Sequence, residues 1–140
     1  MEFDLHSQVF GVQALAPVSI TDNTARVSAI IDTDGYLGLE FITNIGTLAD
    51  ADATFAVTIE DGDASNLSDA AAVATEFLLG TTADAGFTFS DDDEIRRLGY
   101  VGKKRYVRYT ITPSNNTGAA IFGLTAVLYT PLSGPASENT

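Results

Sequence analysis

The sequence contains no cysteine and no tryptophan, and His6 is its only histidine. Without cysteine, the chain can form no disulfide, no thiolate nucleophile and no four-cysteine zinc site. A catalytic triad that depends on histidine would have to use His6, close to the start of the chain. The acids could in principle supply the carboxylate pair of a glycosidase, but their positions in turns and the lack of tryptophan argue against a sugar-cleaving site.

Long apolar runs are also missing, because none approaches the roughly 20 residues that a membrane helix needs. Met1–Asp4 lacks the basic-then-apolar order of a signal peptide. Gly35, Gly38 and Gly46 are scattered rather than gathered into a phosphate-binding loop. We therefore expect a protein made in a cytoplasm that has no membrane partner, no cofactor, no catalytic residues and no enzymatic activity.

Basic residues are scarce: the chain has 7 against 19 acids, and its net charge is −12. Residues 1–95 hold 18 of the acids and one base, Arg26. The other six bases form what we call the basic strip: Arg96, Arg97, Lys103, Lys104, Arg105 and Arg108. The acidic body should repel nucleic acid and anionic membranes. The basic strip is therefore a candidate partner-binding site, or it neutralises carboxylates of the same molecule.

Alternation of apolar and polar residues predicts β-strands through most of the chain. In Tyr36–Ile45, Leu39 and Phe41 share a face, and Phe55–Ile59 alternates in the same way. We expect these two strands, joined by one loop, to pair antiparallel. The segment Ser68–Leu79 is ambiguous, with a strand or irregular chain slightly favoured over a short helix. The other expected strands are Val9–Ala16, which should end in a turn or bend at Pro17, Val27–Ile31, Phe87–Phe89, Ile95–Val101, Tyr106–Thr112 and Ala119–Tyr129.

At 140 residues and 45% apolar content, the chain can form one domain with a real core. About eight short strands separated by turns predict an all-β, antiparallel β-sandwich of the jelly-roll type, with a closed barrel as second choice. The last strand is apolar on both faces and should be central. We expect a single β-sandwich domain over residues 1–130 and a flexible C-terminal tail over residues 131–140.

Three tyrosines near the basic strip could be read as a surface for stacking nucleic-acid bases: Tyr100, Tyr106 and Tyr109. Alternation argues against this, because Tyr109 shares a face with Val107 and Ile111 and should be in the core. Lys103, Lys104 and Arg105 should lie at a turn or at the entry to a strand. We expect no nucleic-acid partner.

Three acidic clusters could supply oxygen ligands to calcium: Asp32–Gly35, Glu60–Asp63 and Asp91–Glu94. Calcium takes six to eight oxygens, and none of these clusters matches the complete twelve-residue calcium loop. Acidic turn residues that solubilise a hairpin explain them more simply, so no metal site is predicted.

The run Arg97-Leu98-Gly99-Tyr100-Val101-Gly102-Lys103-Lys104-Arg105-Tyr106-Val107-Arg108 resembles a signature of small virion proteins from tailed phages and prophages. Other segments agree with that group in order, and the likeness covers most of residues 1–132: Met1–Ser7, Val12–Pro17, Ile31–Tyr36 with Leu39–Phe41, and Ala126–Leu128. The acids of Asp91–Glu94 and the Ser133–Ser137 tail depart from the group.

The resemblance implies a decoration or cement protein on the capsid surface of a virion, made in the host cytoplasm. Its partner would be the major capsid protein, with Lys103, Lys104 and Arg105 in the docking loop. It would act as a homo-oligomer, with a trimer as first choice. A neck, tail or spike-base component stays open, as does a carbohydrate- or receptor-binding module on the particle.

Overall fold

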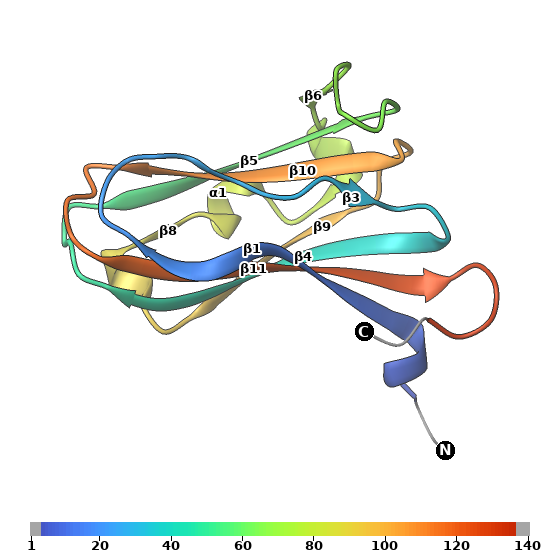
Figure 1. Cartoon of the computed structure of the whole chain (residues 1–140), viewed down its shortest axis with the longest axis horizontal. Coiled ribbons are helices and arrows are strands. Elements are labelled where there is room, and N and C mark those ends of the chain that lie inside the picture. The colour runs from blue at the N-terminus through green and yellow to red at the C-terminus, as the bar shows by residue number, and fades with distance from the viewer. Residues whose placement is uncertain (1–3, 137–140) are drawn as a thin grey trace.

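The computed structural model describes residues 4–136 (Figure 1). In this range the chain forms eleven strands, arranged as two antiparallel sheets that pack face to face. The first sheet contains, in spatial order, β1 (Val9–Ile20), β11 (Ala120–Pro131), β4 (Tyr36–Leu48), β9 (Ile95–Tyr100) and β7 (Leu78–Leu79). The second contains β2 (Arg26–Val27), β3 (Ile31–Asp32), β10 (Tyr106–Ser114), β5 (Thr54–Gly62), β6 (Ala71–Ala72) and β8 (Phe87–Thr88). Short helices complete it: η1 (His6–Gln8), η2 (Thr75–Phe77), α1 (Thr82–Ala85) and η3 (Phe89–Asp91).

The strand pairing is that of a jelly roll. β1 pairs with β11, β2 and β3 with β10, β4 with β9, and β5 with β6 and β8. β2 and β3 can be counted as one interrupted strand, and β6 and β8 as another. With the short edge strand β7 set aside, the eleven strands then become eight. These eight lie in the orders first-eighth-third-sixth and second-seventh-fourth-fifth. The predicted jelly-roll sandwich of about eight strands is confirmed.

The predicted pairing of Tyr36–Ile45 with Phe55–Ile59 is wrong. β4 lies in the first sheet between β11 and β9, whereas β5 lies in the second beside β10. Each strand has an apolar inner face, so the loop between them crosses from one sheet to the other and brings these faces together across the core. If the two strands paired within one sheet, their apolar faces would not pack against each other and would have to be buried by other elements.

Three smaller expectations are corrected or resolved by the structure. The expected strand Val27–Ile31 is interrupted, because Ser28 leaves the ladder to exchange hydrogen bonds with the backbone of Tyr109. Phe89 begins η3 rather than ending a strand. Ser68–Leu79 is irregular chain with two short strands and one turn of 3-10 helix, as the favoured interpretation had it.

The core lies between the two sheets and is built from alternate residues of the long strands. Phe41 of the first sheet meets Tyr109 of the second with ring centroids 4.7 Å apart. Phe55 and Phe87 stack at 4.7 Å, and Phe122 packs edge-on against both. β11 is central, with β1 on one side and β4 on the other, as its two apolar faces predicted.

Backbone hydrogen bonds join residues near the two ends of the described part of the chain to other segments. The amide of Ala136 donates to the carbonyl of Ser7 at 2.8 Å, and the amide of Leu132 donates to the carbonyl of Gly35 at 2.9 Å. The domain and tail boundaries stay predictions, and residues 1–3 and 137–140 lie outside the described residues. No helix of the described part is long and apolar enough to cross a membrane.

Candidate functional site

The centre of the basic strip is the connection from β9 in the first sheet to β10 in the second, residues 100–106, which we call the corner. It lies at the end of the sandwich that also carries the β3–β4 turn and the β5–β6 loop (Figure 1). Three cations of the strip, Lys103, Lys104 and Arg105, belong to it, at a turn as predicted. Its geometry depends on carboxylates that come from distant parts of the sequence.

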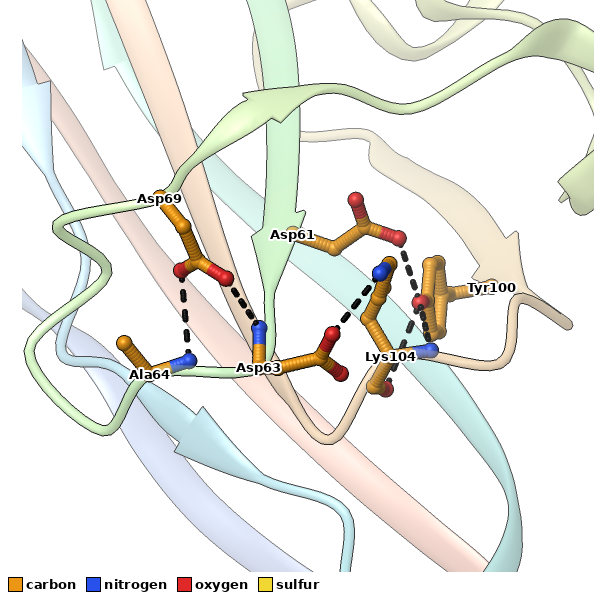
Figure 2. A network of polar contacts seen from close by, with 6 residues as sticks. All are labelled: Asp61, Asp63, Ala64, Asp69, Tyr100 and Lys104. Carbon is orange, nitrogen blue, oxygen red and sulfur yellow. Dashed lines mark hydrogen bonds and ion pairs between the residues drawn. The ribbon is translucent and has the colours of Figure 1, made fainter.

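Tyr100 ties the two sheets together at the corner. Its ring is buried, with 3% of the residue exposed, and its hydroxyl donates to the carboxylate of Asp61 on β5 at 2.6 Å. The same hydroxyl accepts the backbone amide of Lys104 at 3.2 Å (Figure 2). Burial, followed by the bond to Asp61, raises the pKa of Tyr100 well above its ordinary value. The phenol therefore stays protonated and remains a donor.

Two aspartates, Asp63 and Asp69, hold Lys104 in place, and Figure 2 shows their contacts. Its ammonium is 2.8 Å from the carboxylate of Asp63, which raises the pKa of Lys104. Asp69 accepts the backbone amides of Asp63 at 2.8 Å and Ala64 at 3.2 Å, and these bonds lower its pKa. The β5–β6 loop is thus folded back so that Asp63 faces the corner. Because the pair is exposed, it orients the loop more than it stabilises the fold.

Arg105 fastens the corner to the β3–β4 turn. Its guanidinium bonds both carboxylate oxygens of Asp32, at 2.8 and 2.9 Å, which lowers the pKa of Asp32. It also lies over the ring of Tyr106, 5.1 Å from the ring centroid. The carbonyl of Arg105 accepts the amide and the hydroxyl of Thr33 at 2.9 and 2.8 Å. Side chain and backbone are therefore both held.

Gly102 allows the corner to close tightly. A Cβ atom at this position would overlap the hydroxyl and ring of Tyr100. The spacing Gly99-Tyr100-Val101-Gly102 in the sequence is the signal of this close approach. Asp61, Asp63 and Asp69, the acids that complete the network, were not predicted as site residues, because nothing local links them to cations roughly 40 positions away.

The structure separates the six cations of the basic strip. Arg108 lies on the outer face of the second sheet, where its Nε donates to Glu60 at 2.6 Å. Arg96 pairs with Asp91 at 2.8 Å and with Glu94, and Arg97 lies on the outer face of the first sheet. Neutralisation within the molecule is confirmed for Arg96, Lys104, Arg105 and Arg108. Among residues 4–136, Lys103 makes no ion pair, and a partner role for the strip stays a prediction.

A hollow of about 430 Å³ adjoins the corner. Its lining combines two carboxylates, two ammonium-bearing side chains and apolar surface: Asp61, Asp63, Lys103, Lys104, Ala72, Ala74 and Phe77. Such a lining can receive a side chain that has an apolar stem and a polar end. It offers binding by charge and contact area rather than a group poised for covalent chemistry.

Each of the three candidate calcium clusters contains acids that pair with cations of the basic strip: Asp32 with Arg105, Glu60 with Arg108, Asp63 with Lys104, and Asp91 and Glu94 with Arg96. No group of three or more acidic, histidine or cysteine side chains in the described part of the chain is arranged to hold a metal ion. Two of the three tyrosines considered for base stacking, Tyr100 and Tyr109, are buried in the core. Tyr106 is half-buried beneath Arg105.

The chain was compared with known proteins. No protein-family model matches it, and no curated protein is significantly similar to it. Among solved structures, a chain of infectious bursal disease virus, Gx strain, matches at 13% identity with a TM-score of 0.44, over 91% of this chain and 34% of the viral one. The CBM22-1–GH10 modules of Clostridium thermocellum endo-1,4-beta-D-xylanase 10B, complexed with xylohexaose, match at 11% identity with a TM-score of 0.44, over 97% of this chain and 27% of theirs.

Proposed function

We propose that this chain is a non-enzymatic structural protein of a virion that binds the capsid shell as a decoration or cement protein. The observation that carries the proposal is the corner. The segment Gly99–Arg108, which is the most specific part of the resemblance to phage virion proteins, forms a connection clamped by acids from other turns. A surface ordered in advance loses little conformational entropy when it docks, which suits a protein that works by adhesion.

Lys103 is the cation that this surface offers to a partner. Lys104 and Arg105 hold the loop in place through their aspartate partners, while Lys103 borders the hollow and has no ion-pair partner among the described residues. A carboxylate of the major capsid protein can pair with it. Because a shell repeats the same contact many times, modest affinity at each contact is sufficient. Arg96, Arg97 and Arg108 lie outside this docking surface.

The experiment is retention of the purified chain on empty capsids of the virus that encodes it. Lys103→Gln should reduce retention, and the difference from wild type should be larger at about 0.05 M than at about 0.5 M salt. Ala51→Glu is the matched control, because it makes the same change in net charge in an exposed turn at the opposite end of the sandwich. Its retention should equal that of wild type.

The outcomes separate the parts of the proposal. Equal loss in both variants would mean that net charge, not Lys103, governs docking. No retention of the wild-type chain on capsids would overturn the decoration role itself. Imaging of intact particles at residue resolution then decides between the shell and a neck or tail position.

A further inference from the structure

The outer faces of the two sheets carry almost no net charge, although the molecule as a whole carries −12. On the first sheet, the positions that alternate with core residues hold one acid and one base: Val9, Gln13, Glu40, Ile42, Asn44, Leu79, Ile95, Arg97, Ile121, Thr125, Val127 and Tyr129. Most of the remaining acids lie in the turns and at strand ends. Electrostatic repulsion between two of these acidic molecules is therefore weakest when they approach face to face.

The two faces differ in chemistry. The second sheet presents hydroxyl groups, from Thr54, Thr58, Thr110, Thr112 and Ser114, beside its ion pairs. The first presents aliphatic side chains, of which Ile95 is 56% exposed, Leu79 52% and Ile121 40%. Water is a good partner for the hydroxyls and a poor one for the aliphatic groups. The first sheet is thus the face that gains from being covered.

Glu40 and Arg97 make this face complementary to a copy of itself. In the register of β4 and β9, Glu40 lies opposite Gly99 and Ile42 opposite Arg97, so the two charges are neighbours. Between them is a hollow of about 310 Å³, lined by Glu40, Leu79, Gly80 and Arg97. Partial burial raises the pKa of Glu40, and Arg97 offsets part of that rise. A half-turn rotation about an axis that passes between the two charges places Glu40 of each copy opposite Arg97 of the other.

The shape and area of the face also fit a second copy. Sheets with the same right-handed twist pack face to face with their strands about 30° apart. Five strands about 4.8 Å apart, over about eight residues of about 3.3 Å each, cover about 600 Å². Two copies would bury about 1,200 Å² in total, the lower end of the range for specific interfaces.

We propose that the outer face of the first sheet is a self-association surface, on which two copies of this chain pack about a two-fold axis with Glu40 of each beside Arg97 of the other. The resemblance implied a trimer, whereas the arrangement of charges on this face is that of a pair. The inference does not depend on the virion role, and its test uses the purified chain without capsids.

The first measurement is sedimentation equilibrium of the full chain at low and high salt. Because two bodies of charge −12 repel, and salt screens exposed charges most, dimer formation should strengthen between about 0.05 M and about 0.5 M salt. Association held mainly by exposed ion pairs would instead weaken over the same increase in salt, because salt screens the attraction. A monomer at both salt concentrations, or a mass of three copies, would overturn the proposal.

A pair of single substitutions then locates the face. Ile95→Lys places a charge in the aliphatic surface and should raise the dissociation constant about tenfold or more, a loss of about 1.4 kcal/mol. Val27→Lys is the matched control: Val27 is 52% exposed on the outer face of the second sheet, and the change in net charge is the same. Equal effects of the two substitutions would contradict the assignment.

Charge complementation tests the two-fold contact directly. Glu40→Arg alone and Arg97→Glu alone each place like charges in opposition and should remain monomeric. An equimolar mixture should form a heterodimer, because both two-fold contacts then join an arginine of one variant to a glutamate of the other. Urea unfolding of each variant establishes that it is folded. If the folded variants associate no better mixed than apart, the pairing is wrong.

Discussion

Two buried tyrosines on neighbouring segments use the same side chain in different ways. The hydroxyl of Tyr100 donates to Asp61 and links the two sheets. Tyr109 is fully buried, and its hydroxyl meets hydrogen-bond geometry with no described residue. Burial raises the pKa of Tyr109 to about 12, although the neighbouring Thr43 hydroxyl offsets part of that rise. The ring of Tyr109 contributes to the core through Phe41, whereas its hydroxyl is desolvated without a hydrogen bond of good geometry.

The same substitution should therefore change stability in opposite directions at the two sites. Tyr100→Phe removes the donor to a partly buried carboxylate and should lower the free energy of unfolding by about 1 to 3 kcal/mol. Tyr109→Phe removes an unpaired hydroxyl and should raise it by up to about 1 kcal/mol. Urea unfolding followed by circular dichroism measures both. A loss at Tyr109 as large as that at Tyr100 would show that its hydroxyl has a partner.

Among the elements, β4 and β11 are joined through a ring that covers a glycine. Tyr129 on β11 lies opposite Gly38 on β4, and a Cβ atom at Gly38 would overlap the ring of Tyr129. Gly11 on β1 lies in the same sheet, but a Cβ atom there would meet nothing within 4 Å. Packing of a neighbouring ring therefore requires glycine at position 38, whereas no neighbouring atom requires it at position 11.

Alanine at these two positions separates the reasons. Gly38→Ala should lower the free energy of unfolding by about 1 to 3 kcal/mol, because the ring of Tyr129 must move from its packed position. Gly11→Ala should raise it by about 0.4 to 1 kcal/mol, because the unfolded chain loses conformational freedom while the folded strand has room. Thermal unfolding of the two variants beside wild type checks both signs. Equal effects would mean that ring packing is not the cause.

At the scale of the whole molecule, the acids are gathered in turns, where backbone amides bind them. Asp50 accepts the amide and hydroxyl of Thr117 and the amide of Asp52, and these bonds lower its pKa. Backbone amides lower the pKa values of Asp22 and Asp69 in the same manner, and the hydrogen bond from the Arg105 side chain is the main cause of the lowered pKa of Asp32. The folded state therefore holds these carboxylates in their charged form more readily than the unfolded chain does.

The sign of the pH dependence follows from these shifts. Stability from a carboxylate whose pKa is lowered on folding is present above the unfolded value of 3.8 and is lost as the pH falls through the folded value. Asp50→Asn should be less stable than wild type near neutral pH, and the two unfolding free energies should converge as the pH falls through the lowered pKa of Asp50 in the folded state. Urea titrations from about pH 2 to about pH 6 measure this. A gap that stays constant over that range would contradict it.

Local pattern was sufficient to predict much of this fold. The alternation of Val107, Tyr109 and Ile111 predicted both a strand and its buried side, because a side-chain period of two is a property of the extended backbone itself. The apolar faces of β11 predicted its central place for the same reason. The turn at Lys103–Arg105 followed from charge, since cations are most easily solvated where the chain leaves a sheet.

Other features needed the tertiary structure. Whether β4 pairs with β5 or crosses to the other sheet depends on where two apolar faces meet, and alternation is identical in the two cases. The ion pairs of Lys104 and Arg105 join positions that only the closed jelly roll brings together, and so does the bond from Tyr100 to Asp61. Amino-acid order by itself determined strands, their buried sides and a surplus of acid. The folded molecule decided which acid meets which cation, because contacts between distant segments depend on three-dimensional distance rather than on neighbouring residues.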